Sequence, residues 1–476
     1  MMEQQNQTLP GMTIFNAMVN NAPLIVFRIL FGLLMIVESI GAIATGWVHR
    51  AFIEPRMTFT ILPQGWPQPL PGYGMYGWFV AMAIASAGVM VGYRTRLSAT
   101  ALALLWSGAY LMQKTHYNNH YYLAVILCWV MVILPVHLRA SYDEQRLGQR
   151  IEACPQMIIR AFQLQTGIVF TFAAIAKLDP GWGSGNYLAV VFGQKAHYPI
   201  LGPLLGDPLF QRFIATSGIF FDALIIPALA WRRTRLFALV GLVVFNLFNS
   251  VVFQIGVFPY LVLALAVLFF DPDTVEHAFR WIPGLRSSRS PDNDETTDDE
   301  TANDEIAEGE PRSKAHHGVL SPTPIPPVWR WLIGVYFVFQ LLMPFRHHLF
   351  PGDVTWTEEG HRMSWRMMLR VKYGELVLVV RDPDSQRTWT VDQHAWLTPK
   401  QRRRVATRPD FLFQFVQMLK AHYAAEGMPN IEIYAQTSAV SLNGAPPAPL
   451  YDSTINLARA SYPLWSRSPW VLDRAP

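Results

Sequence analysis

The chain has 476 residues, of which 51% are hydrophobic and only 15% are charged, and its formal net charge is +4. Because soluble proteins carry about 25% charged residues, this composition excludes an ordinary soluble enzyme and a disordered chain. The mean hydropathy of +0.19 is too low for a chain that lies in a membrane throughout, which predicts apolar spans joined to a sizeable polar part.

Nine segments are apolar enough to be predicted as membrane-spanning helices, which need about 20 residues. They cover 24–44, 76–92, 97–113, 121–136, 158–176, 213–231, 236–253, 257–270 and 329–343. The range 187–205 is also apolar, but Pro199, Gly202 and Pro203 interrupt it, which predicts a re-entrant or interfacial segment. The first span lacks the basic start and cleavage site of a signal peptide, so we expect it to be retained.

Basic residues in the loops predict the orientation, because Lys and Arg concentrate on the cytoplasmic side of a membrane protein. Arginines follow the second, fourth, sixth and eighth spans, and these four loops share one side if the N-terminus is cytoplasmic. They are Arg94, Arg96, Arg139, Arg146, Arg150, Arg232, Arg233, Arg235, Arg280, Arg286 and Arg289. We therefore expect an integral membrane protein, in a bacterial inner membrane, with an extracytoplasmic C-terminal domain and no nucleic-acid partner.

The stretch 283–327 differs from the rest in being rich in Ser, Asp, Glu, Thr and Pro. Between 292 and 310 it holds ten acidic residues and no basic one. Such a segment cannot bury enough apolar surface to fold, which predicts a disordered, acidic and Pro-rich cytoplasmic linker. An acidic regulatory tail is the alternative interpretation.

The chain after about residue 346 has the pattern of a mixed α+β domain. Two strands are expected around a turn, followed by a helix and a further strand, at 376–380, 388–391, 409–425 and 430–435. The predicted fold is thus a mainly α integral membrane bundle of eight or nine spans with a C-terminal extracytoplasmic α+β domain. The expected division is a membrane domain at 1–282, the linker at 283–327, a last transmembrane helix at 328–345 and the outer domain at 346–476.

Lys177 ends the fifth predicted span and is followed by the turn Asp179-Pro180-Gly181. One interpretation is an interfacial lysine that snorkels towards water and pairs with Asp179. The other is a lysine held at a fixed corner beside an apolar wall, where desolvation favours the neutral amine and allows it to act as a base.

The segment 116–122, with the sequence HYNNHYY, lies between the third and fourth spans. It is either an aromatic belt at the membrane interface or a hydrogen-bonding site, since two asparagines beside two histidines exceed what a belt requires. No nearby carboxylate or cysteine completes a ligand set, so no metal is expected. Cys128 and Cys154 form no metal or redox spacing. The predicted topology puts this segment, Lys177 and the C-terminal domain on one face.

Two predicted spans carry polar residues at depth. Asn246 and Asn249 in the seventh span indicate either hydrogen bonds between helices or a cavity. Asp222 in the sixth span is a functional candidate or a partner for a basic group.

Two arginines follow the last span closely, four residues apart. Arg362 and Arg366 would share a helix face, on which they could grip a carboxylate with forked hydrogen bonds. Alternatively, the two arginines form ion pairs with Glu358 and Glu359 within the domain.

With these motifs the chain resembles the vitamin K-dependent gamma-glutamyl carboxylases, in their bacterial form with an HTTM-type membrane domain. The matching runs are NNHYYL at 118–123, AKLDPGW at 176–182, NSVVFQIGVF at 249–258, and WT at 356–357 with SWRMM at 364–368. Asn246 stands where animal members carry His. The resemblance covers most of the chain outside the linker.

The resemblance implies a carboxylase that is also an epoxidase. In that family a neutral lysine deprotonates vitamin K hydroquinone, oxygen adds to the anion, and the strong base so formed removes the γ-proton of a peptide glutamate. The carbanion takes up CO2, and the quinone leaves as its 2,3-epoxide. Lys177 matches the base, His120 the histidine that stabilises charge at the glutamate, and Asn119 the asparagine beside it. The implied cofactor is a reduced vitamin K of the phylloquinol or menaquinol type.

Other residues of the matched motifs are expected to bind the two substrates. The quinol is expected to contact Asn118, Asp179, Trp182 and Asn249. The glutamate substrate is expected to contact Trp356, His361, Arg362, Trp365 and Arg366. Expected partners are an exported Glu-containing protein and a quinone reductase that recycles the quinol. Two alternatives stay open: a quinol oxygenase without carboxylation, and a non-catalytic membrane protein that binds quinone or lipid.

Overall fold

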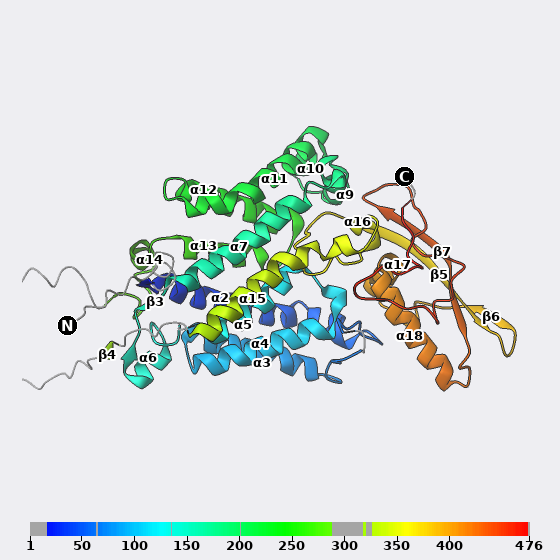
Figure 1. Cartoon of the computed structure of the whole chain (residues 1–476), viewed down its shortest axis with the longest axis horizontal. Coiled ribbons are helices and arrows are strands. Elements are labelled where there is room, and N and C mark those ends of the chain that lie inside the picture. The colour runs from blue at the N-terminus through cyan, green and yellow to red at the C-terminus, as the bar shows by residue number, and fades with distance from the viewer. Residues whose placement is uncertain are drawn as a thin grey trace, which may run out of the picture.

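The computed structural model describes residues 17–62, 65–134, 136–199, 201–287, 318–319 and 326–474. The chain forms a helical bundle that runs along its longest axis and a smaller C-terminal domain at one end of that bundle (Figure 1). Most of the predicted linker at 283–327 lies outside the described residues. The fold is mostly helical, with a sheet in the C-terminal region, as the sequence predicted.

Helices occupy all nine ranges in which spans were predicted. They are α2 (Ala22–Ala44), α3 (Gly74–Val91), α4 (Thr95–Met112), α5 (Asn119–Ile133), α7 (Gln156–Ala176), α11 (Pro208–Ala230), α12 (Arg235–Phe248) with η3 (Asn249–Phe253), α13 (Phe258–Ala266) with η4 (Val267–Phe269), and α15 (Pro327–Leu342) with η6 (Met343–Leu349). Six of the helices among the described residues are long and apolar enough to cross a membrane, namely all of these except α4, α5 and α13–η4. Helix α5 has only 15 residues, which is short for a bilayer.

The end of the bundle away from the C-terminal domain gathers the basic loops (Figure 1). Arg235 lies 3.1 Å from Asp271 and Arg150 lies 2.8 Å from Glu144. Arg139 is fully buried there and donates a hydrogen bond of 2.8 Å to the side chain of Asn21. The loops used to predict the orientation are therefore neighbours in space.

Short elements connect the long helices. At the basic end they are β1 (Met18–Asn20), α6 (Tyr142–Leu147), β2 (Gln149–Arg150), β3 (Ala153–Pro155), α14 (Pro272–Ala278) and β4 (Gly318–Val319). Elsewhere they are η1 (His49–Ile53), η2 (Lys114–His116), α8 (Pro180–Gly183), α9 (Asn186–Gly193) and α10 (Leu201–Gly206). The apolar range 187–205 is thus broken into the short helices α9 and α10, in agreement with its Pro and Gly residues.

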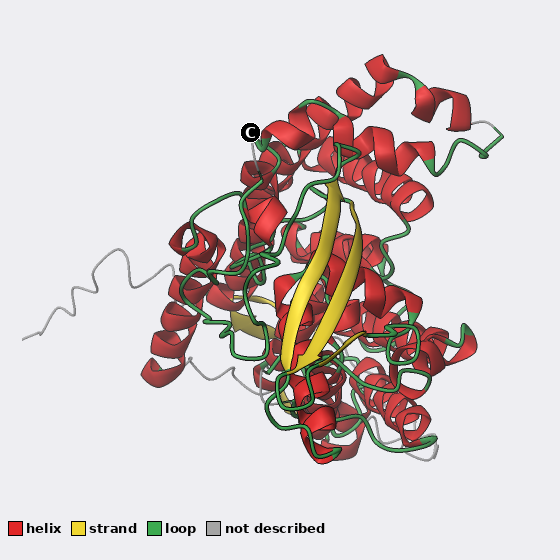
Figure 2. Cartoon of the chain, turned by 90° about the vertical axis from the view of Figure 1, so that its right-hand side faces the viewer, coloured by secondary structure: helices red, strands yellow, loops and turns green. Residues whose placement is uncertain are grey.

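The C-terminal domain is a three-stranded antiparallel sheet with two helices, seen end-on to the bundle in Figure 2. The strand order is β6-β5-β7, with β5 (Lys372–Asp382), β6 (Arg387–Thr390) and β7 (Glu432–Leu442). Helices α17 (Pro399–Thr407) and α18 (Pro409–Ala425) complete it, after the single-turn α16 (Val354–Thr357). The predicted strands and the helix at 409–425 are confirmed, whereas α17 was not predicted.

The segment between α16 and β5 is an irregular loop, so the prediction that Arg362 and Arg366 share a helix face is wrong. Several of its residues, among them Glu358, Met363 and Trp365, have positive φ angles of 64°, 61° and 55°. Residues in this left-handed conformation cannot continue an α-helix. The loop instead reaches from the C-terminal domain into the end of the bundle, where Trp365 belongs to the bundle core.

Candidate functional site

A cavity of about 190 Å³ lies where the bundle meets the C-terminal domain. The connection between α4 and α5 forms one wall, and the loop after α16 forms most of the other. Its lining residues are Tyr117, Asn118, Asn119, His120, His361, Arg366, Met367, Met368, Arg370 and Arg408. The structure thereby brings the predicted residues Asn118, Asn119 and His120 to the same cavity as the predicted residues His361 and Arg366.

The bundle wall of the cavity is held by hydrogen bonds that begin helix α5. The Asn118 side chain caps the helix by accepting a hydrogen bond of 2.7 Å from the Tyr121 amide. The Asn119 side chain donates to the Arg366 carbonyl at 3.2 Å, and so ties the two walls together. The His120 ring stacks on Phe258 at a centroid distance of 4.1 Å, and only 8% of this histidine is exposed. These contacts fix the imidazole at the cavity wall.

The domain wall is organised around the buried carboxylate of Glu358. Arg370 makes two hydrogen bonds to it at 2.5 and 2.7 Å, and Lys372, Arg408 and His361 lie 3.6, 3.9 and 3.3 Å away. Burial alone would raise the pKa of Glu358, but Arg370, Arg408 and the other cations hold it well below its ordinary value. Burial, offset in part by Glu358, lowers the pKa of Lys372 to about 7. Glu358 is therefore a carboxylate that keeps several cations in place.

A second ion cluster holds Arg362 away from the cavity. Asp410 pairs with Arg362, at 2.5 Å, and with Lys114, at 2.7 Å. Burial lowers the pKa of Lys114 to about 8 although Asp410 opposes this shift. Of the two predicted arginines, only Arg366 lines the cavity. Neither arginine pairs with Glu358 or Glu359 in an ion pair among the described residues, so that alternative is wrong for this structure.

Lys177 lies at the C-terminal end of α7, where only 7% of it is exposed. Its ammonium forms an ion pair with Asp222 of α11 and lies 5.3 Å from the centre of the Trp182 ring. Trp182 is itself anchored to α11, because its indole donates to the Ala215 carbonyl at 2.9 Å. The predicted pairing of Lys177 with Asp179 is wrong: α7 and α11 pack together and bring Asp222 to the lysine.

Asp179 pairs with Arg366, at 3.3 Å. Because Asp179 is two residues from Lys177 and Arg366 lines the cavity, this pair connects the lysine to the polar cavity. Met368 also lines the cavity, and it packs against the apolar cluster that contains Trp182. The lysine and the cavity are thus adjoining parts of one region.

The remaining predicted residues lie outside the cavity wall. Trp356 is fully buried in the core of the C-terminal domain, where its indole donates to the Leu472 carbonyl at 3.0 Å. Trp365 is fully buried in the bundle core and packs on Tyr122 at 5.1 Å. Asn249 is buried in the short helix η3. The two tryptophans therefore hold the domain and the loop in place.

Sequence reasoning did not select Arg370, Arg408 and Tyr117, although all three line the cavity. Tyr117 belongs to the HYNNHYY segment, which was a usable signal. Arg370 and Arg408 carry no local signal, since only the folded chain brings them to Glu358.

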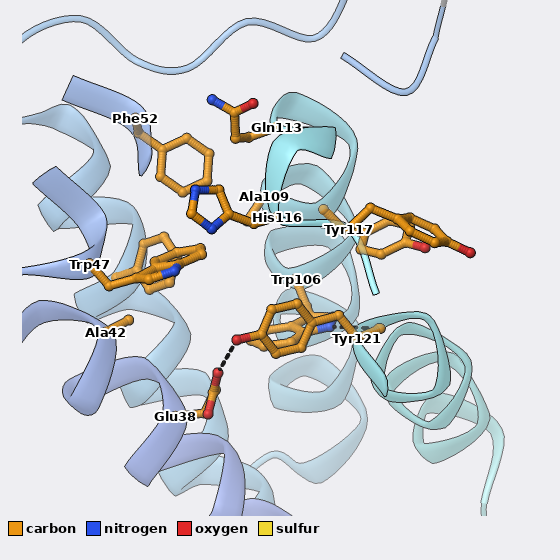
Figure 3. A pocket seen from close by; sticks show the side chains of 12 residues that line it. Glu38, Ala42, Trp47, Phe52, Trp106, Ala109, Gln113, His116, Tyr117 and Tyr121 are labelled. Atoms are coloured by element: carbon orange, nitrogen blue, oxygen red, sulfur yellow. Dashed lines mark hydrogen bonds between the residues drawn. The ribbon is translucent and has the colours of Figure 1, made fainter. Parts of the chain in front are cut away.

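A second, smaller cavity of about 40 Å³ lies between α2, α4 and α5 (Figure 3). The hydroxyl of Tyr121 donates a hydrogen bond of 2.7 Å to the carboxyl of Glu38 at its edge. Aromatic side chains form most of the wall, including Trp47 and Trp106. Its volume suits water-sized molecules rather than a bicyclic quinol ring. The described residues contain no group of three or more His, Cys, Asp or Glu side chains that could hold a metal ion.

A helical membrane bundle with a polar cavity beneath a C-terminal α+β domain defines the general class, an integral membrane protein with a site at one end of the bundle. The family model of the HTTM domain matches residues 16–274, and that of the vitamin K-dependent gamma-carboxylase, lumenal domain, matches residues 326–475. The chain therefore belongs to the vitamin K-dependent gamma-carboxylase family, as its motifs predicted. Among solved structures no match was found.

Membership of this family carries several properties. The function is gamma-carboxylase-like in general, and the protein is an enzyme of the carboxylase kind. The family uses vitamin K and acts on Glu-containing protein substrates. The apolar helices and the HTTM domain make the chain an integral membrane protein.

Proposed function

We propose that this protein oxygenates a vitamin K-type quinol to its 2,3-epoxide and uses that reaction to carboxylate glutamates of an exported protein. The observation that carries the proposal is the Arg366–Asp179 ion pair, which connects a polar cavity to the buried Lys177. A coupled reaction needs the two substrates in adjoining sites, and the two regions have different chemistry suited to each.

The polar cavity suits a glutamate side chain. Its volume of about 190 Å³ is below the roughly 300–1,000 Å³ of pockets that enclose drug-sized ligands. Three arginines line it, Arg366, Arg370 and Arg408, and forked guanidinium groups bind carboxylates well. We assign His120 and Asn119 to the same substrate, with His120 stabilising charge at the glutamate and Asn119 holding the cavity wall. His361 and Arg366 complete this assignment.

The lysine region suits a lipid-soluble quinol. Lys177 is a buried amine beside the aromatic ring of Trp182, in an apolar cluster that includes Leu188 and Phe192. Lys177, Trp182 and Asn249 would hold the quinol, and Lys177 would take the proton of its hydroxyl group at Nζ. Oxygenation of the bound quinol supplies the strong base that removes the γ-proton of glutamate. The burial of this region limits the water that would quench such a base.

The topology that we propose keeps the N-terminus cytoplasmic and the C-terminal domain extracytoplasmic, in a bacterial inner membrane. It is supported by the basic loops that gather at the end of the bundle opposite the domain (Figure 1). We also keep the division into 1–282, 283–327, 328–345 and 346–476. The exported substrate would then meet the cavity on the outer side, and a quinone reductase would regenerate the quinol.

The test is a product assay on the purified protein with reduced vitamin K, oxygen, isotope-labelled bicarbonate and a Glu-rich peptide. We expect both the epoxide and label fixed on glutamate. Epoxide without fixed label would indicate a quinol oxygenase and overturn the carboxylation half. Neither product, with a folded protein, would overturn the whole proposal.

A further inference from the structure

We propose that Asp222 is a positioning residue that holds Lys177 as an ammonium and thereby sets the pH above which the lysine is free to act as a base. This inference rests on the role proposed for Lys177. It adds a second residue to the reaction, on a different helix, which acts through the lysine rather than on the quinol.

The pair is geometrically well defined. Lys177 and Asp222 are 7% and 4% exposed, and their side chains are in direct hydrogen-bond contact across the α7–α11 interface. The Trp182 ring covers the ammonium and is tied by its own hydrogen bond to Ala215, seven residues before Asp222 on α11. The lysine is therefore held between two elements whose positions are fixed by packing.

Asp222 and Lys177 interact with each other rather than with the other charged groups nearby. Lys177 is the charged group that acts on Asp222 among the described residues. Asp179, the next carboxylate along the chain, faces Arg366 at 3.3 Å. The apolar cluster beside the lysine contributes Ala176, Ala215 and Val252, which cannot titrate. Its one titratable member among the described residues is Tyr187, an uncharged phenol whose ring stacks on Trp182 at a centroid distance of 5.5 Å. The lysine thus has one close counter-charge and little solvent.

The ion pair with Asp222 affects the ability of Lys177 to act as a base in two opposite ways. A carboxylate in contact with an ammonium stabilises the charged form, so the pair must lose one proton before Nζ is a free amine. The amine beside a carboxylate then binds the quinol proton more strongly, because the ion pair re-forms as the proton arrives. Asp222 therefore delays the appearance of the base with rising pH, and strengthens the base once it has formed.

The proton balance is simple. At rest the pair is an ammonium and a carboxylate, with no net charge. One proton leaves Nζ for solvent and gives an amine beside a carboxylate, with net charge −1. When Nζ takes the hydroxyl proton of the quinol, the pair returns to zero net charge and the quinol becomes its monoanion. No electron is transferred in this step.

The test compares the pH dependence of epoxide formation in the wild type and in Asp222→Asn, with Asp222→Glu as the conservative variant. In Asp222→Asn the rise of the rate should move to lower pH by at least about one unit, since the ammonium has lost its counter-charge. The limiting rate at high pH should fall by at least about tenfold, with the KM for quinol changed less than about threefold. Asp222→Glu should keep the wild-type onset. If the rate of Asp222→Asn rose at the same pH as that of the wild type, the proposal would be overturned. A merely structural role would lower the rate of epoxide formation without changing the pH at which it rises.

A second readout does not depend on catalysis. The modification of Lys177 by acetic anhydride, followed by mass spectrometry over a range of pH, reports the fraction of free amine. Half-modification should occur at lower pH in Asp222→Asn than in the wild type, and equal values would overturn the inference. If the wild type makes no epoxide at any pH, the proposed function fails while this labelling still decides the role of Asp222.

Discussion

The guanidinium of Arg366 lies 3.3 Å from the carboxylate of Asp179 and joins the loop after α16 to the turn after α7. Both side chains are mostly buried, with 12% and 20% of the side-chain surface exposed. Ion pairs that are shielded from solvent are screened less by salt than surface pairs, so this contact holds its two elements in register. It links the polar cavity to the turn that follows Lys177.

Arg366→Ala should therefore impair carboxylation more than it impairs folding. We expect the kcat/KM for a Glu-containing peptide to fall by at least about tenfold, because the cavity loses one of its carboxylate-binding groups and its link to Asp179. The measurement is the rate of label fixed from bicarbonate over a range of peptide concentrations. Arg381→Ala, an exposed arginine on β5, is the control and should leave this rate unchanged. An equal loss in both variants would argue against a specific role for Arg366.

The Glu358 cluster predicts a large stability effect. Glu358→Gln removes the negative charge that Arg370, Arg408 and Lys372 share in the interior. Breaking a buried pair by removing one partner costs roughly 3–5 kcal/mol, and the apparent Tm of the purified protein should fall accordingly. Glu375→Gln, at an exposed position of β5, should have almost no effect. If the two variants unfolded at the same temperature, the cluster would not be a stabilising centre.

The same carboxylate predicts how stability varies with pH. Because the pKa of Glu358 in the folded protein is well below its ordinary value of 4.5, the stabilisation is fully present above that value. It is lost only as the pH falls below 4.5 towards the lower pKa of the folded state. Around neutral pH the difference in Tm between wild type and Glu358→Gln also includes the protonation of Lys372, whose pKa of about 7 is supported by Glu358. The part due to Glu358 itself should shrink as the pH falls below about 4.5. A difference that kept growing as the pH fell below about 4.5 would contradict the depressed pKa of Glu358.

Substitution of His120 is expected to impair carboxylation more than epoxide formation. Its ring is fixed on Phe258 at the wall of the polar cavity, which Arg366, Arg370 and Arg408 also line. His120→Ala should reduce carboxylation relative to epoxide formation by at least about tenfold, in line with the usual contribution of a positioned acid–base side chain. The exposed His277→Ala at the opposite end of the bundle is the control. An unchanged ratio of the two products would remove His120 from the glutamate site.

The parts of the fold that depend on local patterns could be predicted from the sequence. The strands around Asp382 and the helix Pro409–Ala425 follow from alternation, turn residues and helical periodicity. The loop that contains Arg362 could not be predicted, since it contains several residues with positive φ and its ion pairs reach distant parts of the chain. Arg362 is held by Asp410, far along the chain, and local spacing carries no information about such a pair.

The residues of the candidate site could likewise be predicted only in part. Motifs brought Asn119, His120 and Lys177 to attention because each is polar where an apolar residue is expected. The partner of Lys177 was misassigned, because Asp179 is its neighbour in sequence whereas Asp222 is its neighbour in space. Arg370, Lys372 and Arg408 were missed for the same reason, because the folding of the C-terminal domain brings them to Glu358 from different parts of its sequence.

The central claim is that Lys177 is the base that starts a coupled reaction. Its most direct test is to measure epoxide and fixed bicarbonate in the same samples of wild type, Lys177→Ala and Lys195→Ala at neutral pH. Lys195 lies in the nearby turn after α9 and serves as the matched control. We predict that Lys177→Ala loses both products together while Lys195→Ala keeps both. Epoxide formed by Lys177→Ala at the wild-type rate would contradict the account.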